Sequence, residues 1–223
     1  MNILLIGDSF GAPRKGKNGK NCVDLSQTWP VLIKEELEKK GLLVAIDFKP
    51  YRMLDEIIDI LEDVHVKYDL IVIHAGIVDS FPRPLPQTLF YSKSKWAKFI
   101  RKMIKPIRFF WLNHIFCQPM KSQQILEKKL RELFSYSKES HYLLIGITKQ
   151  FHKEAVNTPK QAFFLEECNK MFERVVSDRV NFLDMSHFNN PCCYSESDSH
   201  FNVEGNLMMY QLIKAYLLEK IKN

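Results

Sequence analysis

Residues 2–10 read Asn-Ile-Leu-Leu-Ile-Gly-Asp-Ser-Phe, and this stretch decides the fold. Its first part is a short, unbroken apolar run, which is typical of a strand buried on both faces of a parallel sheet. Glycine, aspartate and serine are turn-forming residues, so the strand is predicted to end in a tight turn. We expect that turn to expose the hydroxyl group of Ser9 at the carboxyl end of the strand.

The rest of the chain alternates between apolar runs and amphipathic runs. Strands are predicted over residues 2–6, 42–48, 68–74, 141–147 and 180–183, and helices over about 27–40, 54–64 and 162–176 and after Asn202. Such alternation predicts a parallel sheet with helices on both faces, a three-layer α/β/α sandwich. A chain of 223 residues with 46% hydrophobic content suits one such domain over residues 1–223.

Three polar or small residues follow the ends of predicted strands. Ser9 comes after the first strand, and Gly76 and Asp79 come after the third. Ligands of open parallel sheets bind outside the carboxyl ends of the strands. The sequence therefore predicts that these segments converge on one rim of the sheet, and that this rim holds the functional site.

A second polar block stands just before the last predicted helix. Residues 198–202 read Asp-Ser-His-Phe-Asn. A serine, a histidine and a carboxylate are the parts of a nucleophilic acyl hydrolase, because the histidine takes the proton of the serine and the carboxylate orients the histidine. The order of these parts differs from that of the nucleophile-elbow hydrolases, in which the serine lies mid-chain and the acid and the histidine follow far apart. Glu196 is the second candidate for the carboxylate that orients the histidine, and His187 is an alternative base.

Together these blocks resemble the GDSL-type esterases of the SGNH hydrolase superfamily. The resemblance implies a flavodoxin-like α/β/α fold with a five-stranded parallel sheet, no cofactor, and serine esterase activity. It assigns Ser9 as the nucleophile, His200 as the base and Asp198 as the acid. The spacing departs from the usual pattern, because Ser197 holds the family's usual acid position. An Asp-x-His block is similar to that of SGNH-like alginate acetylation enzymes.

The third block departs further from the family. Residues 76–79 read Gly-Ile-Val-Asp where the family usually carries Gly-x-Asn-Asp. The resemblance implies that the backbone N–H groups of Ser9 and Gly76 form the oxyanion hole. Val78 has no side-chain donor, and the loss of one such donor costs about 10²- to 10³-fold in rate in a serine protease.

Two arginines near the predicted rim are candidates to supply the missing positive charge. Arg83 follows the third block, and Arg52 follows the second predicted strand. Either guanidinium group is a candidate contact for an oxyanion or an acidic substrate. Asp79 is a further candidate substrate contact and can brace its loop. The basic, glycine-rich residues 14–20 are either a solvated loop or a site that recruits an anion.

The alternation is interrupted over residues 81–139, which we predict to be a helical insertion. It opens with Phe-Pro-Arg-Pro-Leu-Pro, which excludes regular helix or central strand. Residues 93–116 are basic and amphipathic. They form either a helical pair over the sheet with its lysines in water, or a surface for peripheral membrane contact. No nucleic-acid motif accompanies the charge, so a nucleic-acid partner is not expected.

Composition narrows the classes of function. The net charge of +6 indicates an anionic substrate, a membrane surface or a nucleic acid as partner, or else no more than a solvated lysine-rich surface. The five cysteines lack metal-ligand spacing, so we expect no metal and reduced thiols in a cytoplasmic protein. Neither a signal peptide nor a membrane-spanning run is predicted.

The combined prediction is a serine-dependent acyl ester hydrolase or acyltransferase. An O-acylated carbohydrate is the favoured substrate, because of the Asp-x-His block and the basic rim. A lipid or acyl-thioester hydrolase is one alternative. A glycan-binding or assembly protein with a decayed site is the other.

Overall fold

A computed structural model describes most of the chain. The described residues are 1–14, 22–63, 66–86, 88–89, 92–115, 117–119, 121–136, 139–149, 158, 160–185, 188, 190–195 and 200–222.

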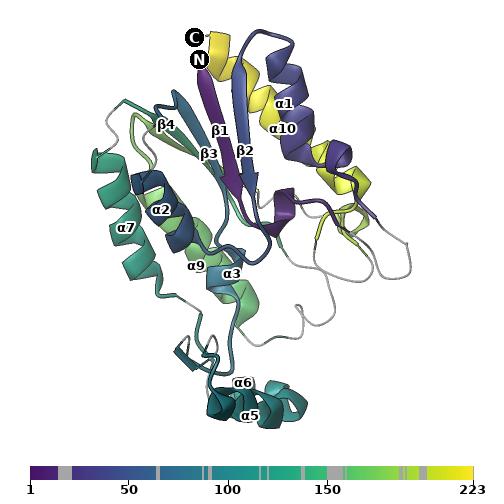
Figure 1. The fold of residues 1–223 in the computed structure, drawn as a ribbon, viewed down its shortest axis with the longest axis vertical. Helices are drawn as coiled ribbons and strands as arrows, with labels where there is room; N and C mark the ends of the chain where they lie inside the picture. Colours follow the sequence, from purple (N-terminus) through teal and green to yellow (C-terminus); the bar gives the residue numbers. More distant parts are fainter. Residues whose placement is uncertain are drawn as a thin grey trace.

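The centre of the molecule is a five-stranded parallel sheet (Figure 1). Its strands are β1 (Asn2–Gly7), β2 (Leu43–Phe48), β3 (Leu70–His74), β4 (His141–Ile145) and β5 (Val180–Leu183). They lie in the order β2-β1-β3-β4-β5. At the carboxyl end of β1, Gly7 is in register with Phe48 of β2 and His74 of β3. The chain order therefore reverses beside β1, which is where open sheets of this kind bind ligands.

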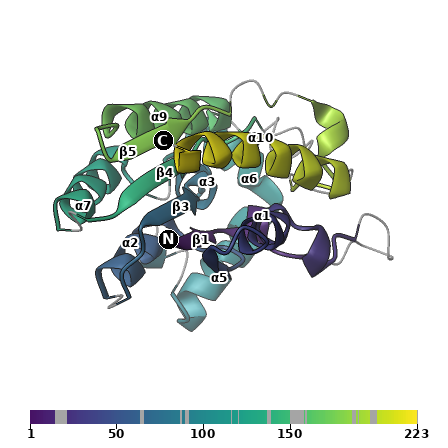
Figure 2. The same ribbon diagram turned by 90° about the horizontal axis from the view of Figure 1, so that it is seen from above.

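Helices cover both faces of the sheet (Figure 2). On one face, α1 (Trp29–Glu38) packs on α10 (Val203–Lys222). On the other face, α2 (Leu54–Asp63) packs on α7 (Gln123–Tyr136), and α7 packs on α9 (Gln161–Arg174). This arrangement confirms the predicted three-layer α/β/α sandwich with a five-stranded parallel sheet.

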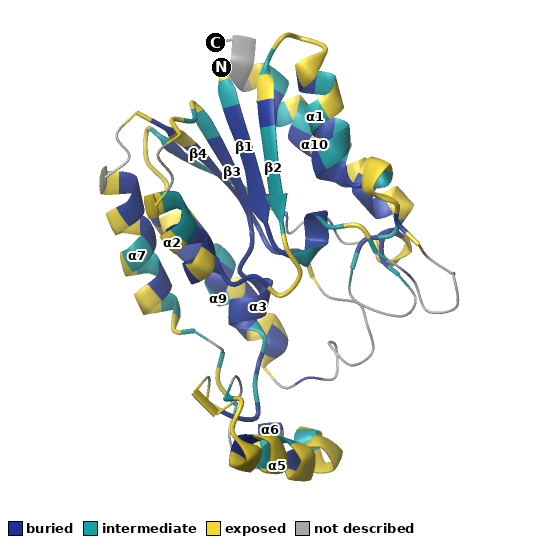
Figure 3. Ribbon diagram, in the orientation of Figure 1, coloured by how far each residue is buried: buried dark blue, intermediate teal, exposed yellow. Residues whose placement is uncertain are grey.

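The core explains why these elements form. The middle residues of β1, β3 and β4 are buried, as expected for strands covered on both faces (Figure 3). Helix α1 turns Trp29, Ile33 and Leu37 inwards at four-residue spacing. Pro30 stands in its first turn, where a proline costs no hydrogen bond.

The range 81–139 divides into two structurally different parts. Helix α7 belongs to the sandwich, because Leu126, Leu130 and Leu133 are buried in the main core. The other part consists of α5 (Lys95–Ile104), the short 3-10 helix η4 (Lys105–Ile107) and α6 (Arg108–His114). We call this part the α5–α6 unit. Figure 1 shows it at the end of the molecule away from both chain termini.

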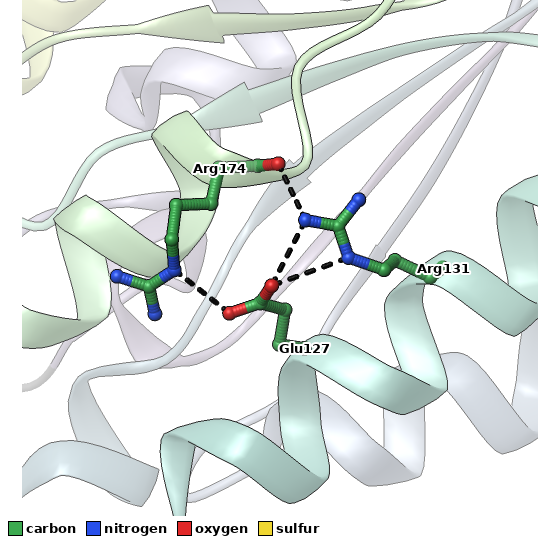
Figure 4. A network of polar contacts seen from close by, with 3 residues as sticks. All are labelled: Glu127, Arg131 and Arg174. Carbon is green, nitrogen blue, oxygen red and sulfur yellow. Dashed lines mark hydrogen bonds and ion pairs between the residues drawn. The ribbon is translucent and has the colours of Figure 1, made fainter.

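An ion-pair network fastens α7 to the end of α9 (Figure 4). The Glu127 carboxylate accepts hydrogen bonds from Nη2 of Arg131 at 2.9 Å and from Nε of Arg174 at 2.8 Å. Arg131 also donates to the carbonyl oxygen of Arg174 at 2.6 Å. The arginines lower the pKa of Glu127, with the hydrogen bond from Arg131 as the largest cause.

No helix among the described residues combines the length and the apolar character needed to cross a membrane.

Candidate active site

Ser9 lies where β1 leaves the sheet. The short 3-10 helix η1 (Ser9–Gly11) begins directly after Asp8, whose Oδ1 accepts a hydrogen bond from the backbone N–H of Phe10 at 3.0 Å. The backbone N–H of Asp8 donates to the carbonyl oxygen of His74 at 3.1 Å. The Gly-Asp-Ser turn is thus held against the end of β3, and Ser9 is left half-buried at the rim.

The structure brings Ser9 and His200 together. The Ser9 Oγ and His200 Nε2 atoms are 2.7 Å apart, although the residues are separated by 191 positions in the sequence. This distance allows the hydroxyl group to donate a hydrogen bond to a neutral imidazole. A serine hydroxyl in direct contact with a base is the arrangement that activates a serine nucleophile.

Aromatic rings hold the His200 imidazole in place. The Phe10 ring stacks on it, with ring centroids 4.9 Å apart and planes inclined by 23°. Phe201 packs edge-on against Phe10, with centroids 5.1 Å apart. The backbone N–H of Ser195 donates to the carbonyl oxygen of His200 at 2.8 Å. The residue that follows the nucleophile therefore also positions the base, a role that no pattern in the sequence predicts.

The start of α10 fixes the backbone that carries His200. Asn202 Oδ1 accepts a hydrogen bond from the backbone N–H of Gly205 at 2.9 Å, so Asn202 is the helix cap that its residue type predicts. Asn202 Nδ2 also donates to the carbonyl oxygen of Cys192 at 2.7 Å. A Cβ atom at Gly205 would overlap the carbonyl oxygen of Cys193, so only glycine allows this close approach.

Several predicted residues lie outside the described part of the chain. These are the predicted acid Asp198, its reserve Glu196, the alternative base His187, Ser197, and residues 15–20 of the basic loop. The assignment of a carboxylate partner to His200 therefore stays a prediction.

The third block turns sharply after β3. Gly76 has φ of +111°, a backbone conformation that side chains rarely adopt, and it precedes the short helix α3 (Ile77–Ser80). The apolar side chain of Val78 is buried in the core. Asp79 is buried too, and its Oδ2 accepts a hydrogen bond from the backbone N–H of Leu54 at 2.8 Å. Asp79 thus ties the Gly76 turn to the start of α2.

Asp8 and Asp79 form a pair of buried carboxyl groups beneath the rim. The pKa of each is raised to about 7, with burial as the largest cause, and the negative charge of Asp79 contributes to the rise at Asp8. Backbone N–H groups that donate to the two carboxylates oppose this shift. The pKa of each buried carboxyl group therefore lies well above the usual value for an aspartate.

The two arginines proposed from the sequence lie in different surroundings. Arg52 is buried and donates to Asp47 at the end of β2, to its carbonyl oxygen at 2.8 Å and its Oδ1 at 2.9 Å. Arg83 lies over the Phe81 ring, with its guanidinium carbon 5.2 Å from the ring centroid. It also lines a pocket of about 220 Å³ in the α5–α6 unit.

His74 contributes to an aromatic floor under the rim. It is buried, and burial lowers its pKa to about 3, so that the ring is neutral. Its ring centroid lies 5.8 Å from that of Phe10 and 5.7 Å from that of Trp29. The only signal in the sequence was a histidine at the end of an apolar strand. Over the described residues, no group of His, Cys, Asp and Glu side chains is arranged to hold a metal ion.

No family model matches the chain, and no curated protein matches it. Solved structures do. The structure of TesA has 14% identity and a TM-score of 0.61, over 97% of this chain and 98% of the other. A lipase/acylhydrolase from Enterococcus faecalis has 14% identity and a TM-score of 0.62, over 98% and 96% of the two chains.

A third similar structure is the acetylxylan esterase Axe2 from Geobacillus stearothermophilus. It has 14% identity and a TM-score of 0.60, over 95% of this chain and 91% of the other. Axe2 was solved as two catalytic mutants, in which a histidine or a serine is replaced by alanine. These likenesses show that the chain has the fold that its sequence blocks predict, the SGNH hydrolase fold.

Proposed function

We propose that this chain with the SGNH hydrolase fold is a serine-dependent ester hydrolase. The observation that carries the proposal is the distance of 2.7 Å between Ser9 Oγ and His200 Nε2. Support comes from the position of this pair at the carboxyl ends of the strands and from the aromatic contacts that fix the imidazole. The same residue types are those replaced in the catalytic mutants of the acetylxylan esterase.

The reaction follows from the two side chains. Ser9 Oγ attacks the carbonyl carbon of the ester while His200 Nε2 accepts the hydroxyl proton. When the tetrahedral intermediate collapses, the bond to the leaving oxygen breaks and His200 returns the proton to that oxygen. The alcohol leaves, and the acyl group stays on Ser9. A water molecule then repeats the sequence and releases the acid, or an acceptor hydroxyl group takes the acyl group.

We propose two further roles from the resemblance. Asp198 accepts a hydrogen bond from Nδ1–H of His200, which fixes the tautomer and stabilises the imidazolium. The backbone N–H groups of Ser9 and Gly76 stabilise the oxyanion. Because Val78 replaces the usual donor, this oxyanion hole has one donor fewer than in relatives with Gly-x-Asn-Asp. We keep Arg52, Arg83 and Asp79 as candidate substrate contacts.

For the substrate we propose an O-acyl ester on a carbohydrate. The similar fold of an acetylxylan esterase supports an acetylated sugar, and that of a lipase/acylhydrolase supports the lipid or acyl-thioester alternative. The two are separated by turnover of acetylated xylooligosaccharides against p-nitrophenyl esters of increasing chain length. A preference for acetyl esters on sugars supports the first, and a rise in turnover with chain length supports the second.

Covalent labelling tests the nucleophile directly. A fluorophosphonate should form one adduct per chain on Ser9, as read by intact mass and peptide mapping. Ser9→Ala should abolish the adduct, and His200→Ala should slow its formation. Ser135→Ala is the matched control, because Ser135 is an exposed serine that donates to the Glu132 carbonyl oxygen on α7. A folded wild-type protein without any adduct would reject the hydrolase and favour the glycan-binding alternative.

A further inference from the structure

The positive charge of the protein is concentrated in one segment. Residues 80–126 hold nine lysines and arginines and no aspartate or glutamate. The rest of the chain holds the other 23 basic residues and all 26 acidic ones, a net charge of −3, although the whole chain carries +6. The α5–α6 unit lies within this segment. A region with charge of a single sign attracts a partner of the opposite sign.

Helix α5 has two apolar faces, and the protein covers only one of them. Ala97 and Ile104, seven residues apart, are buried. Trp96, Phe99 and Met103 form a second stripe at helical spacing, and they are 77%, 56% and 58% exposed. Figure 3 shows how much of this helix is exposed. A contiguous exposed patch of large apolar side chains marks a surface for a partner.

Lysines border the exposed stripe. Along the side of α5 next to the stripe, Lys95, Lys98 and Lys102 recur at helical spacing. Lys105 follows at the start of η4, and all four lysines are exposed. The apolar surface continues into the next turns, because Ile107, Phe109 and Phe110 are exposed as well.

A basic pocket of about 220 Å³ lies at the base of the same unit. Arg83, Arg101, Lys105 and Arg108 line it, and none of the described lining residues is acidic. These side chains add to the positive potential around α5. The unit thus combines a strong positive field with an apolar stripe.

We propose that the α5–α6 unit docks the protein on an anionic phospholipid bilayer. Trp96, Phe99 and Met103 enter the boundary between headgroups and acyl chains, while the lysine ammonium groups stay at the level of the phosphates. A nucleic acid would match the charge but would leave the apolar stripe in water. A second copy of the chain docked through the same surface would cover the stripe but would place like charges against each other.

Co-sedimentation of the full-length protein with vesicles tests this proposal. We expect binding to phosphatidylcholine vesicles that contain phosphatidylglycerol, and at least tenfold weaker binding to phosphatidylcholine alone, since each basic residue near an anionic surface contributes about fivefold. Binding should also weaken as salt is added. Soluble glycerophosphate should compete poorly, because it offers no apolar layer. The assay needs no substrate, so its result does not depend on the proposed ester hydrolysis.

Two matched pairs of variants locate the surface. Lys98→Glu with Lys102→Glu should lower vesicle affinity by about 100-fold or more, whereas Lys39→Glu with Lys40→Glu, the same charge change at two exposed lysines beyond α1, should leave most of the binding. Phe99→Ser should lower affinity about tenfold. Phe163→Ser on α9 removes a phenylalanine of similar exposure, 55%, and should have little effect.

Tryptophan fluorescence gives an independent signal. Trp29 is fully buried and Trp111 is half-buried, whereas Trp96 is 77% exposed, so the blue shift of the emission on adding vesicles should be much smaller in Trp96→Phe while binding persists. The proposal is overturned if anionic vesicles do not bind, or if both members of a matched pair behave alike. It is also overturned if the protein prefers RNA or DNA to vesicles and Phe99→Ser leaves that preference unchanged. Self-association through Phe99 without vesicle binding would overturn it as well.

Discussion

Phe10 and Phe99 place the same amino acid in opposite settings. Phe10 is 6% exposed and stacks on the His200 ring, whereas Phe99 is 56% exposed on the outer side of α5. The rim around Phe10 is surrounded by its own protein, with a buried histidine and two buried carboxyl groups beneath it. The α5–α6 unit presents its aromatic rings to the surroundings. The rim holds a few side chains in fixed positions, whereas the α5–α6 unit exposes an apolar surface that a partner can cover.

The largest expected effect is the loss of turnover when His200 at the rim is replaced. His200→Ala removes the group 2.7 Å from Ser9 Oγ, so hydrolysis of a soluble ester should fall on the order of 10³-fold or more. Vesicle binding should stay at the wild-type level, because the variant leaves the α5–α6 unit intact. Steady-state kinetics and co-sedimentation on the same preparation measure both. A variant with wild-type turnover would show that the observed contact has no role in catalysis.

The next effect compares the two phenylalanines directly. Phe10→Ala should lower the free energy of unfolding by about 3–5 kcal/mol, because it leaves a cavity under the rim. Phe99→Ala should change it by no more than about 0.5 kcal/mol, since that side chain is mostly in water already. Urea denaturation of the two variants measures both changes in unfolding free energy.

A second substitution at Phe10 separates packing from positioning. Phe10→Leu keeps most of the apolar volume but loses the stacked ring, so it should reduce turnover more than stability. Equal losses of unfolding free energy in Phe10→Ala and Phe99→Ala would show that the two phenylalanines contribute equally to stability, contrary to the comparison between the two regions.

A smaller effect concerns the carboxyl groups under the rim. Because burial raises the pKa of Asp79 to about 7, the folded state holds a proton that the unfolded state releases near pH 4. Stability should therefore fall as pH rises from about 4 to about 7, by at most about 1.4 kcal/mol per pH unit for this group. Asp79→Asn keeps an acceptor for the N–H of Leu54 and should have a flatter profile. Denaturation of the wild type and Asp79→Asn between pH 4 and pH 7 tests this prediction. Parallel profiles of unfolding free energy against pH would contradict it.

The smallest effect lies in neither region. Glu127→Gln weakens the network that joins α7 to the end of α9, and it should cost about 0.5–1 kcal/mol of unfolding free energy at low salt. Because the pKa of Glu127 is lowered in the folded protein, this contribution is present near neutral pH and is lost in acid. Glu132→Gln, which disrupts an exposed pair with Lys128 at 3.8 Å, is the control and should cost less. Thermal melts at two salt concentrations compare the variants.

Local patterns accounted for most of the fold. The unbroken apolar run of β1 and the turn residues after it predicted a buried parallel strand and an exposed serine. The pairing of Ser9 with His200 was predictable from the resemblance of their two sequence blocks to the GDSL-type esterases, whereas the strand ends alone placed only Ser9, Gly76 and Asp79 on one rim. Asn202 was predictable as a cap from its residue type alone.

Other features depend on contacts between distant segments, which spacing cannot reveal. The stacking of Phe10 on His200 and the aromatic floor around His74 arise only when four segments meet at the rim. The raised pKa values of Asp8 and Asp79 need burial that no single motif encodes. Likewise, the helical period of α7 shows that it is amphipathic but not that its leucines join the main core.

The start of β1 and the C-terminal end of α10 lie near the amino-terminal ends of the strands, opposite the rim (Figures 1 and 2). The six residues of β1 separate the amino-terminal end of this strand from the Gly-Asp-Ser turn, a distance of about 20 Å at the usual rise of a strand. A reporter or a solid support attached at either end would therefore stand clear of Ser9. Immobilised protein should present its rim and the α5–α6 unit outwards, which suits an assay in which vesicles or polymeric substrates flow past a coated surface.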